Sequence, residues 1–318
     1  MNDRHPPTKE TLLTTDVSVA ADCIRSGGLV AFPTETVYGL GANALDSDAV
    51  ARVFVAKGRP ANNPLIVHVA DFEGVRSLSS SVPEYAESFM EAFFPGPLTL
   101  VLPRDPKVPY GTTAGLETVA VRMPDHPMAL ALIQQSGVFV AAPSANRSGR
   151  PSPTAWEDVY EDLNGRIDVI LKGKPTKYGL ESTVVDCTGE FPMILRPGGV
   201  SLEDLLLVHS QTAYSTSAAL AAKSPGTAHR HYQPNAQVIL VDHSRSLNLP
   251  EDAAFIGFSG GETARLRFEA VDVADYAHHL FSFFRQCEKE GIRTIYCEKV
   301  APFGMGRALM DRLERASS

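Results

Sequence analysis

Short apolar runs alternate along the chain with longer segments in which apolar residues recur at helical spacing. The apolar runs predict strands at residues 29–32, 65–69, 98–102, 119–121, 138–142, 168–171, 183–186 and 194–195. Helices are predicted at residues 16–26, 47–56, 83–94 and 127–135. Strands that alternate with helices favour an α/β sheet with helices packed on it. The last three strands follow one another without a helix, so a mixed sheet is favoured over a purely parallel one.

Polar, proline and glycine residues mark the ends of the predicted helices. Asp16 can cap the first helix, and the glycine pair at 27–28 ends it. Ser47 is expected to cap the second helix. Pro83 begins the third, which stops at the Pro-Gly-Pro sequence of residues 95–97.

The composition changes after residue 208. A stretch rich in Ala, Ser and Thr follows, and a new apolar strand begins at Val238. Further strands are predicted at 255–258 and 292–297, with helices at 273–290 and after residue 306. We therefore expect an α/β domain at 12–208, an interdomain connection at 209–235 and a smaller α/β domain at 236–318. The smaller domain shows no catalytic constellation.

The composition restricts the class of protein. The chain has 318 residues, enough for about two domains, and a formal net charge of −8 at pH 7. This charge argues against a protein that mainly coats nucleic acid, although it leaves room for a local basic pocket. The four cysteines lack zinc-ligand spacing, and no apolar run is long enough to cross a bilayer. A reduced, cytoplasmic protein fits best.

Hydroxyl, amide and cationic side chains gather in turns near predicted strands. The strand ending at residue 32 runs into a turn that carries Thr34 and Thr36. Lys57 and Arg59 lie in a loop that contains two prolines, and residues 143–149 form another polar turn after a strand. Ligands bind at strand ends in open α/β sheets, and these groups suit a polyphosphate and a small polar substrate. A solvated helix end is an alternative of equal weight for the two cations.

A histidine and an arginine lie at the end of, or directly after, two predicted strands. His68 ends an apolar strand, where a histidine is more often structural than functional. Arg122 follows an apolar strand and needs a partner, for which a substrate carboxylate and a structural carboxylate are equally suitable. His229 and His231 have no nearby acidic or thiol third ligand, so a metal site there is unlikely on this pattern.

Residues 39–44 match the dinucleotide-binding pattern GxGxxA only loosely. A turn of six residues separates them from the preceding strand. The region about twenty residues further on contains Lys57 and Arg59 rather than an acidic ligand for a ribose. Tight passage of the backbone is the favoured role for these glycines. The phosphate-binding pattern GxxxxGK[ST] is absent from the sequence.

Seven sequence blocks occur in one order, at residues 32–41, 57–69, 94–99, 119–124, 142–151, 181–186 and 195–198. In this order the blocks resemble the YrdC/Sua5 family. The Ser-Pro-Gly and His-Arg-His-Tyr sequences within 224–232 resemble the linker of the longer Sua5 type, which has an extra C-terminal domain. The resemblance implies a twisted mixed-sheet YrdC-like domain with a concave basic cavity, and a smaller Rossmann-like C-terminal Sua5 domain.

The resemblance also implies an activity. Members of this type make L-threonylcarbamoyladenylate from L-threonine, bicarbonate and ATP and release pyrophosphate. The product serves the threonylcarbamoyladenosine modification of tRNA position 37. We therefore expect a cytoplasmic nucleotidyltransferase that uses Mg²⁺ with ATP and supplies downstream tRNA-modifying transferase machinery. No membrane association and no stable direct binding of nucleic acid are expected.

The family's site residues can be transferred to matching positions. The catalytic set is Lys57, Arg59, Ser144 and Asn146. The residues expected to bind L-threonine are Thr36, His68, Arg122, Ala142 and Ser182. Those expected to bind ATP are Arg59, Asn63, Thr118, Ser144, Ser152, Arg196 and Tyr232. No protein ligand for a metal is implied, and the connection at 209–235 is expected to act as a lid.

Two other functions have to be considered. An RNA-binding or ribosome-maturation protein of the YrdC type would use the basic cavity directly, but the acidic net charge argues against it. A carbamoyl-transferring maturation enzyme contains the same domain. Such enzymes carry cysteine-rich zinc segments, which this sequence lacks.

Overall fold

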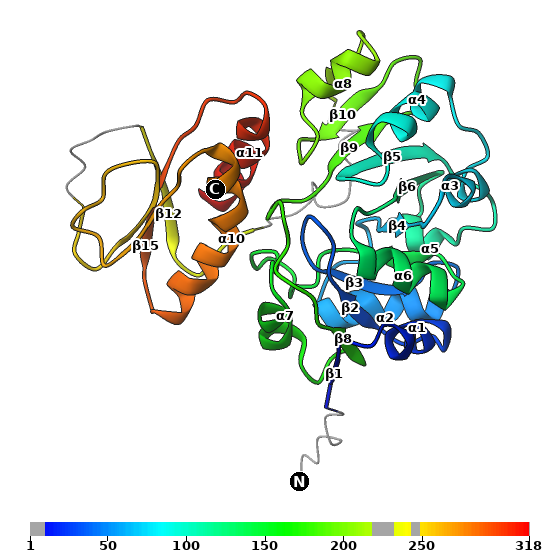
Figure 1. The fold of residues 1–318 in the computed structure, drawn as a ribbon, viewed down its shortest axis with the longest axis horizontal. Coiled ribbons are helices and arrows are strands. Elements are labelled where there is room, and N and C mark those ends of the chain that lie inside the picture. The colour runs from blue at the N-terminus through cyan, green and yellow to red at the C-terminus, as the bar shows by residue number, and fades with distance from the viewer. Residues whose placement is uncertain (1–9, 218–231, 243–248, 318) are drawn as a thin grey trace.

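The computed structural model describes residues 10–217, 232–242 and 249–317, which form two sheets (Figure 1). The larger sheet contains β1 (Leu12–Thr14), β2 (Val30–Phe32), β3 (Gly39–Asn43), β4 (Ile66–His68), β5 (Leu98–Pro103), β6 (Thr118–Arg122), β7 (Val140–Ala142), β8 (Val169–Leu171), β9 (Thr183–Asp186), β10 (Met193–Arg196) and β11 (Ala213–Tyr214). Its strand order is β1-β8-β2-β3-β7-β4-β6-β5-β9-β10-β11. Parallel and antiparallel neighbours both occur, which confirms the predicted mixed sheet.

Helices flank this sheet, and hydrophobic cores lie on both of its faces. The helices are α1 (Val17–Arg25), α2 (Ser47–Lys57), α3 (Phe72–Leu78), α4 (Glu84–Phe93), α5 (Tyr110–Thr113), α6 (Pro127–Ser136), α7 (Trp156–Leu163) and α8 (Leu202–Val208). Ala31 and Val67 belong to the larger core, whereas Val30 and Phe32 pack in a second core with α1 and α6. Side chains alternate between the two faces of a strand, so these cores lie on opposite faces of the sheet.

Two helix caps test the sequence predictions. Asp16 caps α1 by accepting a hydrogen bond from the Ser18 backbone, as predicted. The prediction for α2 was wrong by one residue. Asp46, not Ser47, accepts hydrogen bonds from the backbone amides of Asp48 and Ala49, at 3.0 and 3.1 Å. A carboxylate at this position also interacts favourably with the positive end of the helix dipole.

The glycine-rich segment after residue 38 forms β3, which pairs antiparallel with β2 and β7. It therefore does not open a helix, as a dinucleotide-binding loop would. The glycines are needed for packing. A Cβ atom on Gly39 would lie 3.1 Å from the ring of Phe32, and one on Gly41 would lie 2.7 Å from Val140 Cγ1.

Several short elements were not predicted. They include β1, β3, α3, α7 and α8 in the larger domain. The strand β1 pairs with β8 and has three residues, so its sequence contains too little alternation to identify it. Leu207 of α8 is 87% exposed, and this weakens the apolar periodicity of that helix.

The smaller sheet is parallel throughout its described strands. It contains β12 (Gln237–Val241), β13 (Ala254–Gly257), β14 (Leu266–Glu269) and β15 (Thr294–Glu298), in the order β12-β15-β13-β14. The helices α10 (Val273–Lys289) and α11 (Met305–Ser317) share a core with it. Most of the predicted connection at 209–235, including His229 and His231, lies outside the described residues.

Two arginines of the smaller domain reach into the larger one. Arg285 of α10 donates to the Pro151 carbonyl at 2.6 Å and to Asp162 of α7 at 2.9 Å. Arg312 of α11 donates to Glu181 at 2.8 Å. Both arginine side chains are fully buried. The contact between the domains is therefore polar at these points, and it involves segments next to strands of the larger sheet.

None of the helices described in the structure combines the length and the apolar character that a membrane span requires.

We predict that Gly41→Ala destabilises the fold. The new methyl group would overlap Val140 and would lie 2.9 Å from the Phe32 ring, so buried side chains must shift. The free energy of unfolding should fall by about 1–3 kcal/mol, measured by urea denaturation. Gly111→Ala is the matched control, because its Cβ atom would meet nothing within 4 Å. A Gly41→Ala protein as stable as the control would contradict this packing role.

Candidate functional site

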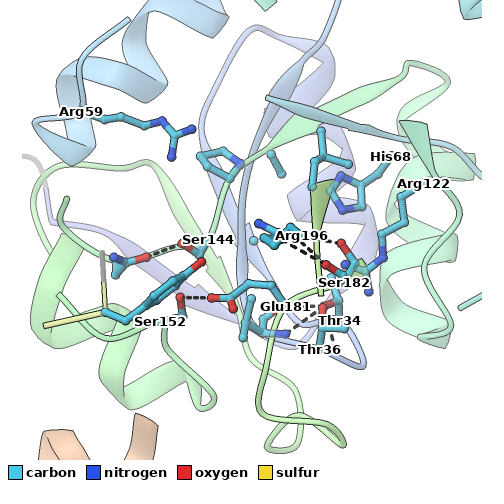
Figure 2. A pocket seen from close by; sticks show the side chains of 17 residues that line it. Thr34, Thr36, Arg59, His68, Arg122, Ser144, Ser152, Glu181, Ser182 and Arg196 are labelled. Atoms are coloured by element: carbon cyan, nitrogen blue, oxygen red, sulfur yellow. Dashed lines mark hydrogen bonds between the residues drawn. The ribbon is translucent and has the colours of Figure 1, made fainter. Parts of the chain in front are cut away.

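A pocket opens on the face of the larger sheet opposite the larger core (Figure 2). We call it the central pocket. It is lined by Thr34, Thr36, Val37, Gly39, Arg59, Ile66, His68, Arg122, Ala142, Pro143, Ser144, Asn146, Ser152, Glu181, Ser182, Arg196 and Tyr232. All of the residues predicted to form the site, except Lys57, Asn63 and Thr118, are in this lining. The fold thus brings together groups that are far apart in the sequence.

Strand register explains why these groups meet. The adjacent strands β4 and β6 pair His68 with Arg122, and β4 and β7 pair Ile66 with Ala142. In β4, Ile66 and His68 point into the pocket, whereas Val67 between them belongs to the larger core. The period of two along a strand therefore separates pocket residues from core residues.

The pocket has two ends. Figure 2 shows His68 and Arg122 at one end, with Thr34 and Thr36 beside them, and we call this the His68 end. Arg59 lies at the opposite end, with Ser144 and Ser152 on the same side, and we call this the Arg59 end. Ser182 lies beside Arg122 and Thr34 at the His68 end, and Glu181 and Arg196 lie between the two ends.

Arg122 has a structural partner at the His68 end. Its Nη2 atom lies 2.6 Å from Glu35 Oε1, and its Nε atom donates to the Gly96 carbonyl at 3.3 Å. The side chains of Arg122 and Glu35 are 4% and 2% exposed. The structural carboxylate considered for this arginine is therefore present. The guanidinium also lines the pocket, and its fork has further donors that can bind a second carboxylate.

His68 is held in its neutral form. Burial, reinforced by the nearby Arg122 charge, lowers the pKa of His68 to about 3. The ring packs edge-on against Phe32, with 5.8 Å between centroids. Its Nδ1 atom is buried and has no hydrogen-bond partner among the described residues. The neutral ring can therefore offer a polar atom to a ligand in the pocket.

Hydroxyl groups at this end are fixed by their neighbours. Thr34 Oγ1 donates to the Val37 carbonyl at 2.7 Å and lies 2.9 Å from Thr36 Oγ1. Ser182 Oγ lies 2.8 Å from Thr99 Oγ1 on β5. Such short contacts hold the hydroxyls in place before a ligand binds.

The Arg59 end is cationic. Arg59 Nη2 donates to the carbonyls of Asn63 and Pro64, at 3.3 and 3.2 Å. Its Nε atom is buried and makes no hydrogen bond within the described part of the chain. Burial lowers the pKa of Arg59 to about 10, an effect that Tyr232 opposes and Arg196 reinforces. Arg59 therefore remains charged at neutral pH.

Lys57 supports the pocket wall from behind. Its Nζ atom donates to the carbonyls of Ser144 and Asn146, at 2.6 and 2.5 Å. Ser144 Oγ in turn donates to Asn146 Oδ1 at 2.5 Å. Burial, reinforced by the charge of Arg59, lowers the pKa of Lys57 well below its ordinary value. The four predicted catalytic residues thus form one cluster, with Lys57 outside the lining.

Asn63 and Thr118 also lie outside the lining. Asn63 is buried in the loop before β4, where its carbonyl accepts from Arg59. Thr118 is the first residue of β6, and Arg122 is the last. The two share a face of that strand, because their spacing is even. Thr118 therefore lies beyond the described pocket, on the same surface of the sheet.

Glu181 was not among the predicted site residues, although it directly precedes Ser182 in one of the recognised blocks. Its Oε1 atom accepts from Ser152 Oγ at 2.6 Å, and its Oε2 atom accepts from Arg312 at 2.8 Å. Burial acts to raise the pKa of Glu181. The charges of Arg312 and Arg196 and the Ser152 hydrogen bond lower it by more, so the net pKa shift is downward. Glu181 is thus an ionised group in the pocket wall.

Tyr232, predicted to contact the nucleotide, comes from beyond the larger domain. It lines the pocket and stacks on Phe281 of α10, with ring centroids 5.4 Å apart. The Arg312 guanidinium lies 5.3 Å from the centre of its ring. Residues of the smaller domain therefore support one wall of the pocket.

The charges of the lining favour an anionic ligand. Arg59, Arg122 and Arg196 line the pocket, whereas Glu181 is the acidic residue in the described lining. No group of three His, Cys, Asp or Glu residues suited to a metal ion occurs among the described residues.

Comparisons with known proteins agree with these features. The Sua5_yciO_yrdC family model, described as telomere recombination, matches residues 22–198. The Sua5_C model, described as the C-terminal domain of threonylcarbamoyl-AMP synthase, matches residues 200–318. Proteins named threonylcarbamoyl-AMP synthase from Pyrococcus abyssi and Bacillus subtilis are 47% and 42% identical to the chain. The first alignment covers 95% of this chain and 94% of the relative, and the second covers 95% and 92%.

A solved structure is similar over almost the whole chain. The crystal structure of Pyrococcus abyssi Sua5 complexed with L-threonine superimposes with a TM-score of 0.88. It is 44% identical, and the match covers 97% of each chain. The α/β fold with a mixed sheet is therefore shared with that protein.

We predict that His68 makes stability depend on pH. Its folded pKa of about 3 lies below the ordinary value of 6.5. Its stabilising contribution is therefore complete above about pH 6.5 and is lost as pH falls toward 3, by up to about 1.4 kcal/mol for each pH unit. In urea denaturation from about pH 7 to pH 5, His68→Gln should lose less stability than the wild-type protein. Equal losses in the two proteins would contradict the neutral, buried histidine.

Proposed function

The chain belongs to the Sua5/YciO/YrdC family, and we propose that it is a threonylcarbamoyl-AMP synthase. It makes L-threonylcarbamoyladenylate from L-threonine, bicarbonate and ATP and releases pyrophosphate. The product serves the threonylcarbamoyladenosine modification of tRNA position 37. Relatives with this name align over nearly the full chain, and a similar structure is a complex with L-threonine. The proposal rests mainly on one pocket, which has an end suited to an amino acid and an end suited to phosphates.

The His68 end suits L-threonine. Arg122 offers guanidinium donors to the amino-acid carboxylate, and Glu35 fixes the arginine in place. Thr36, Ser182 and neutral His68 supply polar groups for the amine and the side-chain hydroxyl. The Ala142 backbone lies at the junction with the other end. A charged histidine would repel the amine, so the lowered pKa of His68 is useful here.

The Arg59 end suits the triphosphate of ATP. Arg59 and Arg196 supply positive charge, and Ser144, Asn146 and Ser152 supply hydrogen bonds. Asn63, Thr118 and Tyr232 are the remaining nucleotide positions of the proposal. Magnesium bound to the phosphates would neutralise part of their charge when ATP is present.

The reaction needs positioning and charge stabilisation more than a protein nucleophile. The amine of L-threonine combines with bicarbonate to give a carbamate and water. A carbamate oxygen then attacks the α-phosphorus of ATP, and the bond from that phosphorus to the bridging oxygen of pyrophosphate breaks. Arg59 stabilises the charge that develops on the phosphates. Lys57 contributes indirectly, since it holds the backbone of Ser144 and Asn146 in place.

We also propose the character of the cavity, the type of the smaller domain, a lid and a cellular location. The arginine-rich lining supports a concave basic cavity, and the parallel sheet of β12 to β15 supports a Rossmann-like smaller domain. The domain boundaries stay those predicted from the sequence. Tyr232 ties the end of the 209–235 connection to the pocket, which supports a lid that excludes water from reactive intermediates. A cytoplasmic location and transfer of the product to tRNA-modifying enzymes follow from the proposed reaction.

The proposed function predicts which amino acid starts the reaction. Pyrophosphate release from ATP and bicarbonate should depend on added L-threonine, and alanine or valine should support much less release. A hydroxyl-binding site rejects a substrate that lacks the hydroxyl because its polar groups are left unpaired. The measurement is a coupled pyrophosphate assay with each amino acid in turn. Equal release with every amino acid, or with none, would contradict the proposal.

The catalytic cluster gives a second prediction. Arg59→Ala should lower threonine-dependent pyrophosphate release about 100-fold or more, because a charge-stabilising donor is lost. Lys57→Ala should have a similar effect through misplacement of the 144–146 backbone. Arg52→Ala is the control, since Arg52 lies on α2 and pairs with Asp168 at a site with 52% side-chain exposure. If either cluster variant turned over like the control, that residue's role would be wrong.

A further inference from the structure

Glu181 is held by both domains at once. Ser152 of the larger domain donates to one carboxylate oxygen at 2.6 Å, and Arg312 Nε of the smaller domain donates to the other at 2.8 Å. Glu181 lines the central pocket, whereas Arg312 does not. A residue of the last helix therefore reaches the pocket wall through one ion pair.

Arg312 occupies a position that an apolar residue would ordinarily fill. It lies on the same face of α11 as Leu309, Leu313 and Ala316, all of which are buried in the core of the smaller domain. Its side chain has no exposed surface. A buried ion pair gains little stability over an apolar pair of the same volume, because both charges lose water. Packing alone therefore does not account for an arginine here.

The charges around the pocket suggest what Arg312 does. An anionic ligand requires the positive charge of Arg59 and Arg196, and an uncompensated carboxylate at Glu181, beside Arg196 in the pocket wall, would cancel part of it. Arg312 compensates Glu181 from outside the lining. Asp311 binds the opposite side of the same guanidinium, at 2.6 Å from Nη1, and fixes its orientation.

We propose that Arg312 is a positioning residue for the nucleotide, and that its ion pair with Glu181 keeps the Arg59 end of the pocket positive enough to bind ATP. This inference rests on the proposed function, because it takes ATP as the ligand of that end. It makes the smaller domain a part of the nucleotide site and not only a cover for it. Glu181, when paired in this way, also holds Ser152 toward the pocket.

Two further observations agree with this role. Burial acts to lower the pKa of Arg312, but the interactions with Tyr232, Glu181 and Asp311 outweigh it, so the net pKa shift is upward and the residue stays charged. Arg285 of α10 binds the Pro151 carbonyl, next to Ser152, and Asp162. The smaller domain thus contacts the segment that carries Ser152 from a second helix.

The test measures MgATP binding to the full-length protein by isothermal titration calorimetry, without L-threonine. Arg312→Met removes the charge and keeps most of the volume, and it should weaken binding at least tenfold. Arg312→Met combined with Glu181→Gln should restore binding to within about threefold of wild type, because the uncompensated charge is gone while the amide still bonds Ser152. Lys289→Met is the control and should bind like wild type. Lys289 also pairs across the domains, with Glu161 at 3.3 Å, but its side chain is 54% exposed.

Each result of the binding measurements either supports or overturns the role proposed for Arg312. Weak binding by both the single and the double variant would show that Arg312 acts through domain structure, and this would overturn the proposal. Unchanged binding by the single variant would also overturn it. If Arg312→Met does not fold, as judged by thermal unfolding, Arg312→Lys keeps the charge and should bind ATP within about threefold of wild type. A loss of tenfold or more in that folded variant would overturn the role of the charge. Failure of the wild-type protein to bind ATP would instead contradict the proposed function.

Discussion

Burial of charge is the constraint on which this structure depends. An ionised side chain inside a protein is costly unless a partner compensates it, and the region around the central pocket buries several. Glu35 pairs with Arg122, Asp162 with Arg285, and Glu181 with Arg312. Each pair fixes a group that lines the pocket or lies directly beside it. The arrangement of these pairs therefore decides which positive groups remain for a ligand.

The sheet provides the geometry that this arrangement needs. The neighbouring strands β4, β6 and β7 place His68, Arg122 and Ala142 on one face, opposite the larger core. The loops after β2 and β7 add hydroxyl groups and amides. The smaller domain then closes the set, because Tyr232 and Arg312 contact each other and reach the same wall. Fold and site are thus coupled through contacts that cross the two domains.

Much of the fold and most of the pocket lining could be predicted from the sequence. Apolar runs located the central strands, and the recognised blocks located residues such as His68, Arg122 and Ser144. What could not be predicted depends on partners that are distant in sequence. The glycines of β3 did not suggest a strand, because their need for small size comes from Phe32 and Val140. Glu181 and Arg312 are 131 residues apart, and only the folded chain shows that they pair. An arginine on the apolar face of the last helix was a signal that could have been noticed.

In the proposed reaction, one pocket joins an amino-acid carbamate to an adenine nucleotide. Mass spectrometry of the product formed from L-threonine, ATP and bicarbonate labelled with carbon-13 tests this directly. We expect a product that contains AMP, threonine and one labelled carbon, together with free pyrophosphate. Conversion of ATP to AMP or ADP without any labelled adenylate would contradict it.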